Sequence, residues 1–114
     1  MIRNFGRDAH KQFWQFSDSE KADHTKRLAR ELSALRGKIG TTQEEIASAV
    51  GVTRQTYGAY ENGSRPIPWS VYLALLFYFD YIPSTHYMIR QLDLFPNEFD
   101  ECWLAGKVML EEII

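Results

Sequence analysis

The chain has 114 residues, of which 45% are apolar, and no low-complexity run. This composition fits a single domain with a modest core. Its one cysteine, Cys102, excludes an intramolecular disulfide and fits a reducing compartment. The longest apolar run, residues 71–79, is far short of the roughly 20 residues that a membrane-spanning helix needs, and the N-terminus lacks a signal-peptide core. We therefore expect a soluble, cytoplasmic protein.

The formal net charge of −2 is unevenly distributed along the chain. Residues 1–65 hold 11 Lys or Arg against 8 Asp or Glu, whereas residues 66–114 hold 2 against 7. A basic face in the first part can meet phosphates. The acidic second part should weaken nonspecific, salt-sensitive binding to nucleic acid.

The first sixteen residues interleave basic and aromatic side chains. They are Arg3, Phe5, Arg7, His10, Lys11, Phe13, Trp14 and Phe16. One reading is a basic arm that reaches along DNA. The other is an aromatic anchor that packs on its own domain or on a second subunit. We favour packing, because rings of this size bury a large area.

Two capping patterns predict where the next helices begin. Ser17 and Glu20 form a capping-box pattern that starts a helix running to about Gly37. Its apolar stripe is Leu28, Leu32 and Leu35. Thr42 and Glu45 form a second capping box, so another helix should begin near Gln43. The apolar face of that helix is Ile46, Ala47 and Val50, and a left-handed Gly51 ends it.

A short turn then leads into a further helix. Thr53 is a good N-cap for a helix from Arg54 to about Asn62, and Pro66 prevents its continuation. Two helices separated by so few residues must cross steeply. Residues 42–62 therefore have the layout of a helix-turn-helix motif, whose second helix lies in the major groove of DNA.

The two sides of the helix after Thr53 differ in chemistry. The i+3, i+4 rule places Tyr57, Tyr60 and Glu61 on one side, which suits a small core. The other side carries Arg54, Gln55, Gly58 and Ala59. Glycine costs about 1 kcal/mol relative to alanine in a helix interior. Its position on the outer side allows close approach to another surface.

Two more helices complete a five-helix, all-α domain over residues 18–92. Pro68 suits the first turn of a helix from Trp69 to Phe79, which is apolar nearly all round and should be the most buried. Pro83 can open a helix to about Gln91. No stretch shows the alternation of a strand. Segments 1–17 and 93–114 flank this domain.

The last segment, Pro96 to Ile114, is predicted to be an amphipathic helix capped by Asn97. Its apolar positions are Phe99, Cys102, Trp103, Gly106, Met109, Leu110 and Ile113. This face can cover the core of its own chain, form a dimer or bind a different protein. Gly106 permits close helix approach in each case.

The central motif resembles the phage-repressor-like helix-turn-helix family of bacterial and phage regulators, often called the Xre or Cro type. The resemblance covers roughly residues 28–79. It rests on Gln43 with Ala47, the turn Val50-Gly51-Val52-Thr53, Arg54-Gln55-Thr56, Glu61-Asn62-Gly63 and Arg65-Pro66.

The resemblance implies a DNA-binding site made of Gln43, Thr53, Arg54, Gln55, Thr56, Gly58, Ala59, Asn62, Ser64 and Arg65. In this reading Gln43 holds a phosphate, and Arg54 and Gln55 reach base edges. The methyl of Ala59 could touch a thymine methyl, and Asn62, Ser64 and Arg65 grip the backbone. Arg36 and Glu61 occupy the positions of a structural ion pair. Gly58 and Ala59 replace the longer polar side chains of many members, so few direct base contacts are expected.

Two functional hypotheses remain open. The first is a homodimeric repressor that binds an inverted-repeat operator in double-stranded DNA. The second is an antitoxin-type protein that binds a partner toxin and regulates its own gene through the same domain. His10, His24 and His86 are scattered without metal-ligand spacing, and no catalytic motif is present. We therefore expect no cofactor, no metal and no enzymatic activity.

Overall fold

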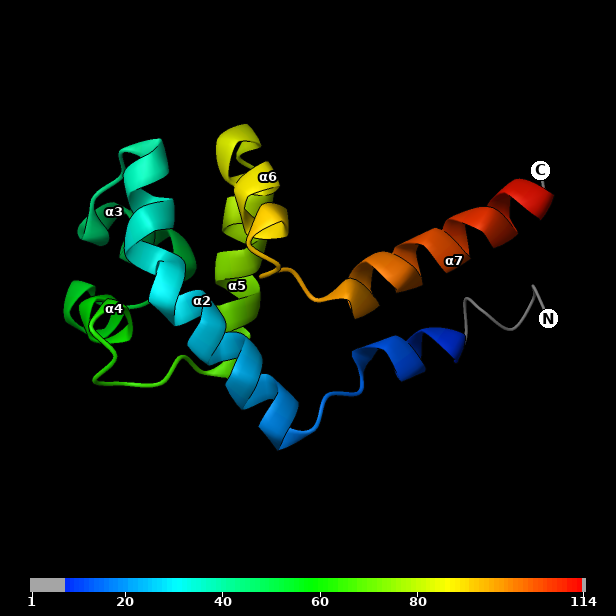
Figure 1. The fold of residues 1–114 in the computed structure, drawn as a ribbon, viewed down its shortest axis with the longest axis horizontal. Helices are drawn as coiled ribbons and strands as arrows, with labels where there is room; N and C mark the ends of the chain where they lie inside the picture. The colour runs from blue at the N-terminus through cyan, green and yellow to red at the C-terminus, as the bar shows by residue number, and fades with distance from the viewer. Residues whose placement is uncertain (1–7, 114) are drawn as a thin grey trace. The chain divides into compact units, whose positions relative to one another are not determined.

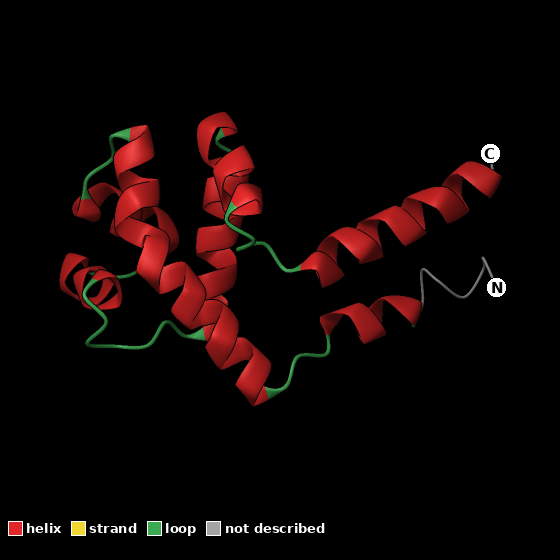
Figure 2. Cartoon of the chain, in the orientation of Figure 1, coloured by secondary structure: helices red, strands yellow, loops and turns green. Residues whose placement is uncertain are grey.

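The computed structural model describes residues 8–113, and every regular element in this range is helical (Figure 2). A 3₁₀ helix, η1, precedes six α-helices, α2 to α7. Their bounds are η1 Ala9–Trp14, α2 Asp18–Ile39, α3 Gln43–Val50, α4 Arg54–Glu61, α5 Trp69–Asp80, α6 Pro83–Gln91 and α7 Asn97–Ile113. The expected all-α fold is confirmed, with η1 as an addition. No helix in the described range is long and apolar enough to cross a membrane.

The chain divides into two compact units. One unit is residues 18–95 and contains α2 to α6; the other combines residues 1–17 with residues 96–114. The two flanking segments, expected as separate extensions, belong to one unit in the structure. We describe each unit by itself.

In the five-helix unit, α2 runs between the α3–α4 pair and the α5–α6 pair (Figure 1). The predicted stripe of Leu28, Leu32 and Leu35 is completely buried. Tyr57 and Tyr60 are buried as well, which confirms the inward side of α4. The rest of the buried apolar core is Ile46, Ala47, Ile67, Tyr72, Leu75, Leu76, Phe79, Ile89 and Leu94. Each fully buried side chain of this size contributes about 1.5–3 kcal/mol.

The capping chemistry sets the bounds of α3 and α4 as predicted. The Glu45 amide donates to Thr42 Oγ1 at 3.1 Å, and the Thr42 amide donates to Glu45 Oε1 at 3.0 Å. Gly51 ends α3 with a φ of 82°. Thr53 caps α4 by accepting a hydrogen bond from the Thr56 amide at 3.1 Å. Side-chain caps therefore fix where both short helices begin, and a left-handed glycine fixes where α3 ends.

Several predicted bounds were wrong by one or two residues. Helix α2 continues through Gly37 to Ile39, because the left-handed residue that ends it is Gly40, with a φ of 71°. Pro68 is the N-cap of α5 rather than a first-turn residue, and α5 continues to Asp80. Helix α5 is not buried all round, since Phe77 is 66% exposed.

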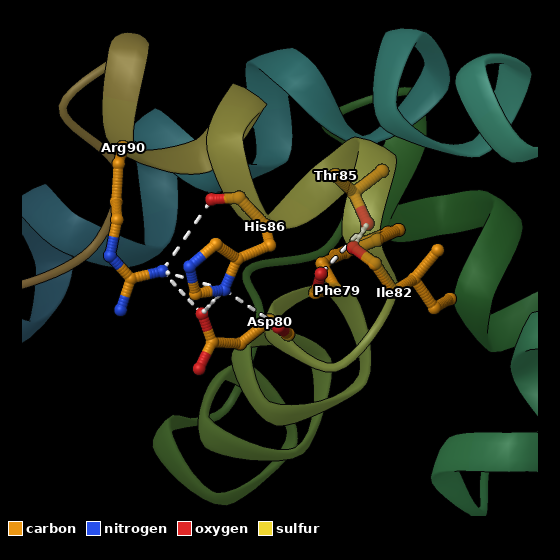
Figure 3. A network of polar contacts seen from close by, with 6 residues as sticks. All are labelled: Phe79, Asp80, Ile82, Thr85, His86 and Arg90. Carbon is orange, nitrogen blue, oxygen red and sulfur yellow. Dashed lines mark hydrogen bonds and ion pairs between the residues drawn. The ribbon is translucent and has the colours of Figure 1, made fainter.

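A polar network fastens α5 to α6 where the chain turns between them (Figure 3). Thr85 is fully buried, and its hydroxyl donates to the Phe79 carbonyl at 2.7 Å. His86 Nδ1 lies 2.8 Å from Asp80 Oδ1 and 2.9 Å from the Asp80 carbonyl, so this nitrogen is placed to donate. Arg90 also pairs with Asp80. The Thr85 and His86 contacts supply partners to backbone carbonyls at the C-terminus of α5, where a helix leaves its last carbonyls without intrahelical donors.

In the smaller unit, η1 packs on α7 through aromatic rings. The Phe99 ring centroid lies 4.3 Å from that of Trp14 and 5.4 Å from that of Phe16. Helix α7 nevertheless exposes apolar side chains along two strips: Trp103 and Leu110 are each 62% exposed, Leu104 58% and Val108 52%. The N-terminal Arg3, Phe5 and Arg7, and the side chains of Met109 and Ile113, lie outside what the structure describes.

Replacing Thr85 with valine should test the α5–α6 corner. Valine keeps the shape but leaves the Phe79 carbonyl without this donor, so we expect the free energy of unfolding to fall by about 1–2 kcal/mol in urea denaturation. The neighbouring exposed residue provides the control, and Ser84→Ala should change stability by less than about 0.5 kcal/mol. Equal losses in the two variants would contradict the assigned hydrogen bond.

Candidate nucleic-acid interface

The ten predicted DNA-binding residues all lie at the surface of the five-helix unit. They come from the first turn of α3, from α4 with its cap, and from the loop after α4. None is buried. Arg54 and Gln55 stand exposed on the first turn of α4, and their side chains make no hydrogen bond or ion pair within residues 8–113. They are therefore available to an external partner.

Six of the ten residues line one open depression with a volume of about 500 Å³. They are Gln43, Arg54, Gln55, Gly58, Ala59 and Asn62. Glu61 and Ser33 complete the lining. Sequence reasoning missed Ser33, which projects from α2. The available signal was its spacing of three residues from Arg36, which places the two on neighbouring parts of one helix face.

The other four residues belong to a hydrogen-bonded edge beside this depression. Thr53 Oγ1 and Thr56 Oγ1 lie 2.9 Å apart, and Arg65 Nη1 donates to Thr56 Oγ1 at 3.3 Å. The Ser64 amide donates to Asn62 Oδ1 at 2.8 Å. The Arg65 amide donates to the Ala59 carbonyl at 3.2 Å. The loop that follows α4 is thus held in one conformation by its own polar groups.

An ion pair between Arg36 and Glu61 orients α4, as predicted. Arg36 Nε donates to Glu61 Oε2 at 2.8 Å and Nη2 donates to Oε1 at 3.2 Å, which makes the pair bidentate. Arg36 Nη1 also donates to the Thr41 carbonyl at 3.2 Å. One guanidinium therefore joins the end of α2 to the end of α4 and to the start of the α3 segment. The pair is structural, since Glu61 is largely enclosed.

The Gln43 side chain joins this network. Its Nε2 donates to Glu61 Oε1 at 3.1 Å. An ionised carboxylate only accepts hydrogen bonds, so this contact fixes which end of the amide faces Glu61. The predicted phosphate contact must then use the second Nε2 hydrogen, while Oε1 remains an acceptor on the depression side. Sequence reasoning did not foresee this internal role for Gln43.

The network also sets the charge states of its members. Burial by itself would raise the pKa of Glu61, but hydrogen bonds from Arg36 and Gln43 outweigh it and hold that pKa below its ordinary value. The carboxylate in turn raises the pKa of Arg36. Burial, reinforced by Glu61, raises the pKa of Tyr57 far above its usual range. Its hydroxyl is buried without a hydrogen bond of normal geometry in the described chain. At neutral pH the site therefore holds a charged pair beside a neutral tyrosine.

Gly58 is not required by packing. A Cβ built at this position would lie 3.5 Å from Gln43 Oε1, an ordinary van der Waals distance. A methyl group would therefore fit, and alanine would favour the helix by about 1 kcal/mol. Because Gly58 has no side chain, nothing projects from the outer surface of α4 at this position next to Arg54 and Gln55.

Replacing Glu61 with glutamine should show how much this network contributes to the free energy of unfolding and how that contribution depends on pH. We expect the free energy of unfolding to fall by about 2 kcal/mol at pH 7, because Arg36 loses its charged partner. The pKa of Glu61 is lowered in the folded state, so its contribution is complete above the ordinary value of 4.5 and is lost as the pH falls through the folded pKa. The difference from the wild type in urea denaturation should therefore narrow below about pH 4.

The exposed Glu44 provides the matched control, and Glu44→Gln should differ from the wild type by about 0.5 kcal/mol or less at either pH. A Glu61→Gln difference that stays constant down to about pH 3 would contradict the ion-pair account.

A comparison with protein-family models agrees with this geometry. Comparison with curated proteins and with solved structures found no match. A family model described as a helix-turn-helix domain matches residues 27–80, from α2 to the end of α5. Such domains are typical of DNA-binding regulators. Residues 27–80 therefore form a helix-turn-helix domain, in agreement with the resemblance to Xre-type regulators.

Proposed function

We propose that this chain is a sequence-specific DNA-binding regulator that places α4 in the major groove. The observation that carries this proposal is the outer surface of α4. Arg54 and Gln55 are exposed and unengaged there, beside the low surface of Gly58 and Ala59. A helix of this kind can approach base edges without first breaking internal hydrogen bonds.

The chemistry of the exposed pair suits the base code of the major groove. Arginine can donate two hydrogen bonds to guanine O6 and N7, and glutamine can pair with adenine N6 and N7. The Ala59 methyl can contact the methyl of thymine. Each good bidentate pair discriminates against a wrong base by about 1–3 kcal/mol. Because only a few side chains of α4 can contact base edges, sequence-dependent DNA shape should add to specificity.

The loop after α4 supports a backbone contact. The Asn62, Ser64 and Arg65 side chains are exposed, and their segment is fixed by the hydrogen bonds from Ser64 to Asn62 and from Arg65 to Thr56 and Ala59. A pre-ordered loop loses little conformational entropy when it binds. At the other edge, the first-turn amides of α3 favour an anion beside Gln43.

We propose further that the regulator is a homodimer that binds an inverted repeat, with repression as its default action. One recognition helix covers only a few base pairs. Two helices related by a twofold axis and about 34 Å apart would read a site long enough to be specific. This role places the chain in the cytoplasm with the DNA, and it assigns no catalytic function or cofactor, since helix-turn-helix domains typically catalyse nothing.

The double variant Arg54→Ala, Gln55→Ala should lose sequence discrimination without unfolding. On duplex DNA selected by the wild-type protein from a random pool, the affinity ratio between selected and scrambled duplexes should fall by at least about 30-fold in fluorescence anisotropy. The matched control, Lys38→Ala with Gln91→Ala, removes one basic residue and one glutamine from exposed positions elsewhere on the unit. A double variant that keeps the wild-type ratio would refute the assigned reading face.

A second candidate function, that of an antitoxin, is favoured by the exposed side chains of α7. Trp103 and Leu110 are seven residues apart on one side of this helix, and Leu104 and Val108 form another strip. Apolar surface of this kind marks protein interaction sites. It can serve dimerisation or capture of a toxin, and the two roles differ in what binds it.

The variant Trp103→Ser, Leu110→Ser separates these outcomes. If α7 forms the dimer, sedimentation equilibrium should show a dimer for the wild type and a monomer for the variant. Glu98→Ser, Glu101→Ser is the control and should remain dimeric. A variant that stays dimeric would contradict a dimer through α7. Purification at native expression level with an equimolar second protein, lost in the variant, would favour the antitoxin role.

A further inference from the structure

A second and larger hollow lies between the first half of α2 and the segment that connects α4 to α5. Its volume is about 690 Å³. Ala22 and Ala29 line the hollow from α2, and Ile67 of the connecting segment and Trp69 at the start of α5 line it as well. Ile67 is buried, and the Trp69 ring stacks on Tyr72 with centroids 4.8 Å apart. We call this hollow the α2 groove. Its floor is apolar and is supported by the buried core beneath it.

Cations surround the apolar floor. Lys21, Lys26, Arg30 and Arg65 line the α2 groove. Lys21 Nζ lies 5.6 Å from the centre of the Trp69 ring, a cation–π distance. Lys26 and Arg30 are exposed and make no ion pair within residues 8–113. The sole acidic residue in the lining is Glu61, which Arg36 already neutralises. The local charge is therefore strongly positive, although the whole chain is slightly acidic.

The α2 groove adjoins the depression that presents Arg54 and Gln55, and Glu61 and Asn62 line both hollows. Arg54, Gln55, Gly58 and Ala59 line only the depression. The match to the helix-turn-helix domain begins at residue 27, so Lys21, Ala22 and Lys26 come from a part of α2 that lies outside it. Most of the lining, Arg30 included, lies inside the matched range, so the groove spans the N-terminal boundary of that range.

We propose that the α2 groove binds a small organic anion with a flat apolar body. The body would lie between the alanines of α2 and the Ile67–Trp69 segment, and its carboxylate or phosphate would meet Lys26 and Arg30. The volume falls within the roughly 300–1,000 Å³ of small-molecule sites, which also combine apolar walls with a few polar groups. Charge complementarity selects an anion over a neutral or cationic ligand of the same shape.

The position of the groove couples it to DNA. Asn62, Gly63 and Arg65 line it, and they belong to the loop proposed to grip the phosphate backbone. An anion held there would place negative charge in the groove that Arg65 also lines, which would repel DNA phosphates from this loop and so weaken DNA binding. This coupling rests on the proposed function, whereas binding of the anion does not.

The first test uses the full chain without DNA and three probes that share one ring system. These are 2-naphthoate, 2-naphthyl phosphate and the neutral 2-naphthol, titrated while NMR follows the indole N–H of Trp69. We expect saturable shifts with at least one anion, and binding of 2-naphthol weaker by at least about tenfold. A preference between the two anions would identify the head group.

Three single variants locate the anion. Lys26→Ala and Arg30→Ala should each weaken anion binding by about tenfold, whereas Lys38→Ala, an exposed lysine elsewhere on α2, should leave it unchanged. No saturable shift up to about 5 mM, or equal affinity for 2-naphthol, would overturn the proposal. The proposal would also be overturned if the Trp69 signal shifted only with duplex DNA or only with a peptide of residues 97–113. The groove would then be a contact for the DNA backbone or a docking site for a helix.

The second test measures coupling. At a concentration that just saturates the wild type, the preferred anion should weaken binding of the selected duplex severalfold in the wild type and clearly less in Arg30→Ala. An unchanged DNA affinity in the wild type would overturn the coupling. If the chain binds no DNA at all, the proposed function fails while the titration still decides the groove.

Discussion

The geometry of the outer surface of α4, the proposed DNA-reading surface, depends on the Arg36–Glu61 ion pair. The helices α3 and α4 have 8 residues each, too few to be stable alone in water. The bidentate pair holds the end of α4 to the end of α2, and Gln43 extends the same contact to α3. The buried Tyr57 and Tyr60 then fix the rotation of α4 about its own axis. Once that rotation is set, Arg54 and Gln55 must face outward.

This arrangement places the residues that stabilise the fold and the residues proposed to contact DNA on opposite sides of one short helix. The inner side of α4 supplies core packing and an ion pair, and the outer side supplies donors and acceptors with no internal partner in the described chain. Gln43 is the exception, since it serves both sides: one amide hydrogen stabilises the network and the rest of the amide borders the depression. Its substitution should therefore be harder to interpret than that of Arg54. The low profile of Gly58 adds to this division, because the fold itself would accept a methyl group there.

Local signals in the sequence were sufficient for much of the fold. The side chains of Thr42, Glu45 and Thr53 act on amides within three residues, so the starts of α3 and α4 were predictable. The end of α2 was missed because two glycines compete for it, and Gly37 is tolerated inside the helix while Gly40 takes the left-handed conformation. Contacts between distant residues were not predictable except where a family pattern existed. The Arg36–Glu61 pair had such a pattern. The joining of Trp14 to Phe99, the place of Ser33 in the depression and the α2 groove each required tertiary packing, which no local spacing encodes.

The central claim is that α4 reads base edges as one of two symmetry-related copies. Selection of duplexes from a random DNA pool by the wild-type chain, followed by sequencing, tests it most directly. The account predicts enrichment of an inverted repeat whose half-site centres are about one helical turn apart, each half-site with a guanine or adenine at the positions that Arg54 and Gln55 can reach. A pool that shows no enriched motif after repeated selection would contradict it.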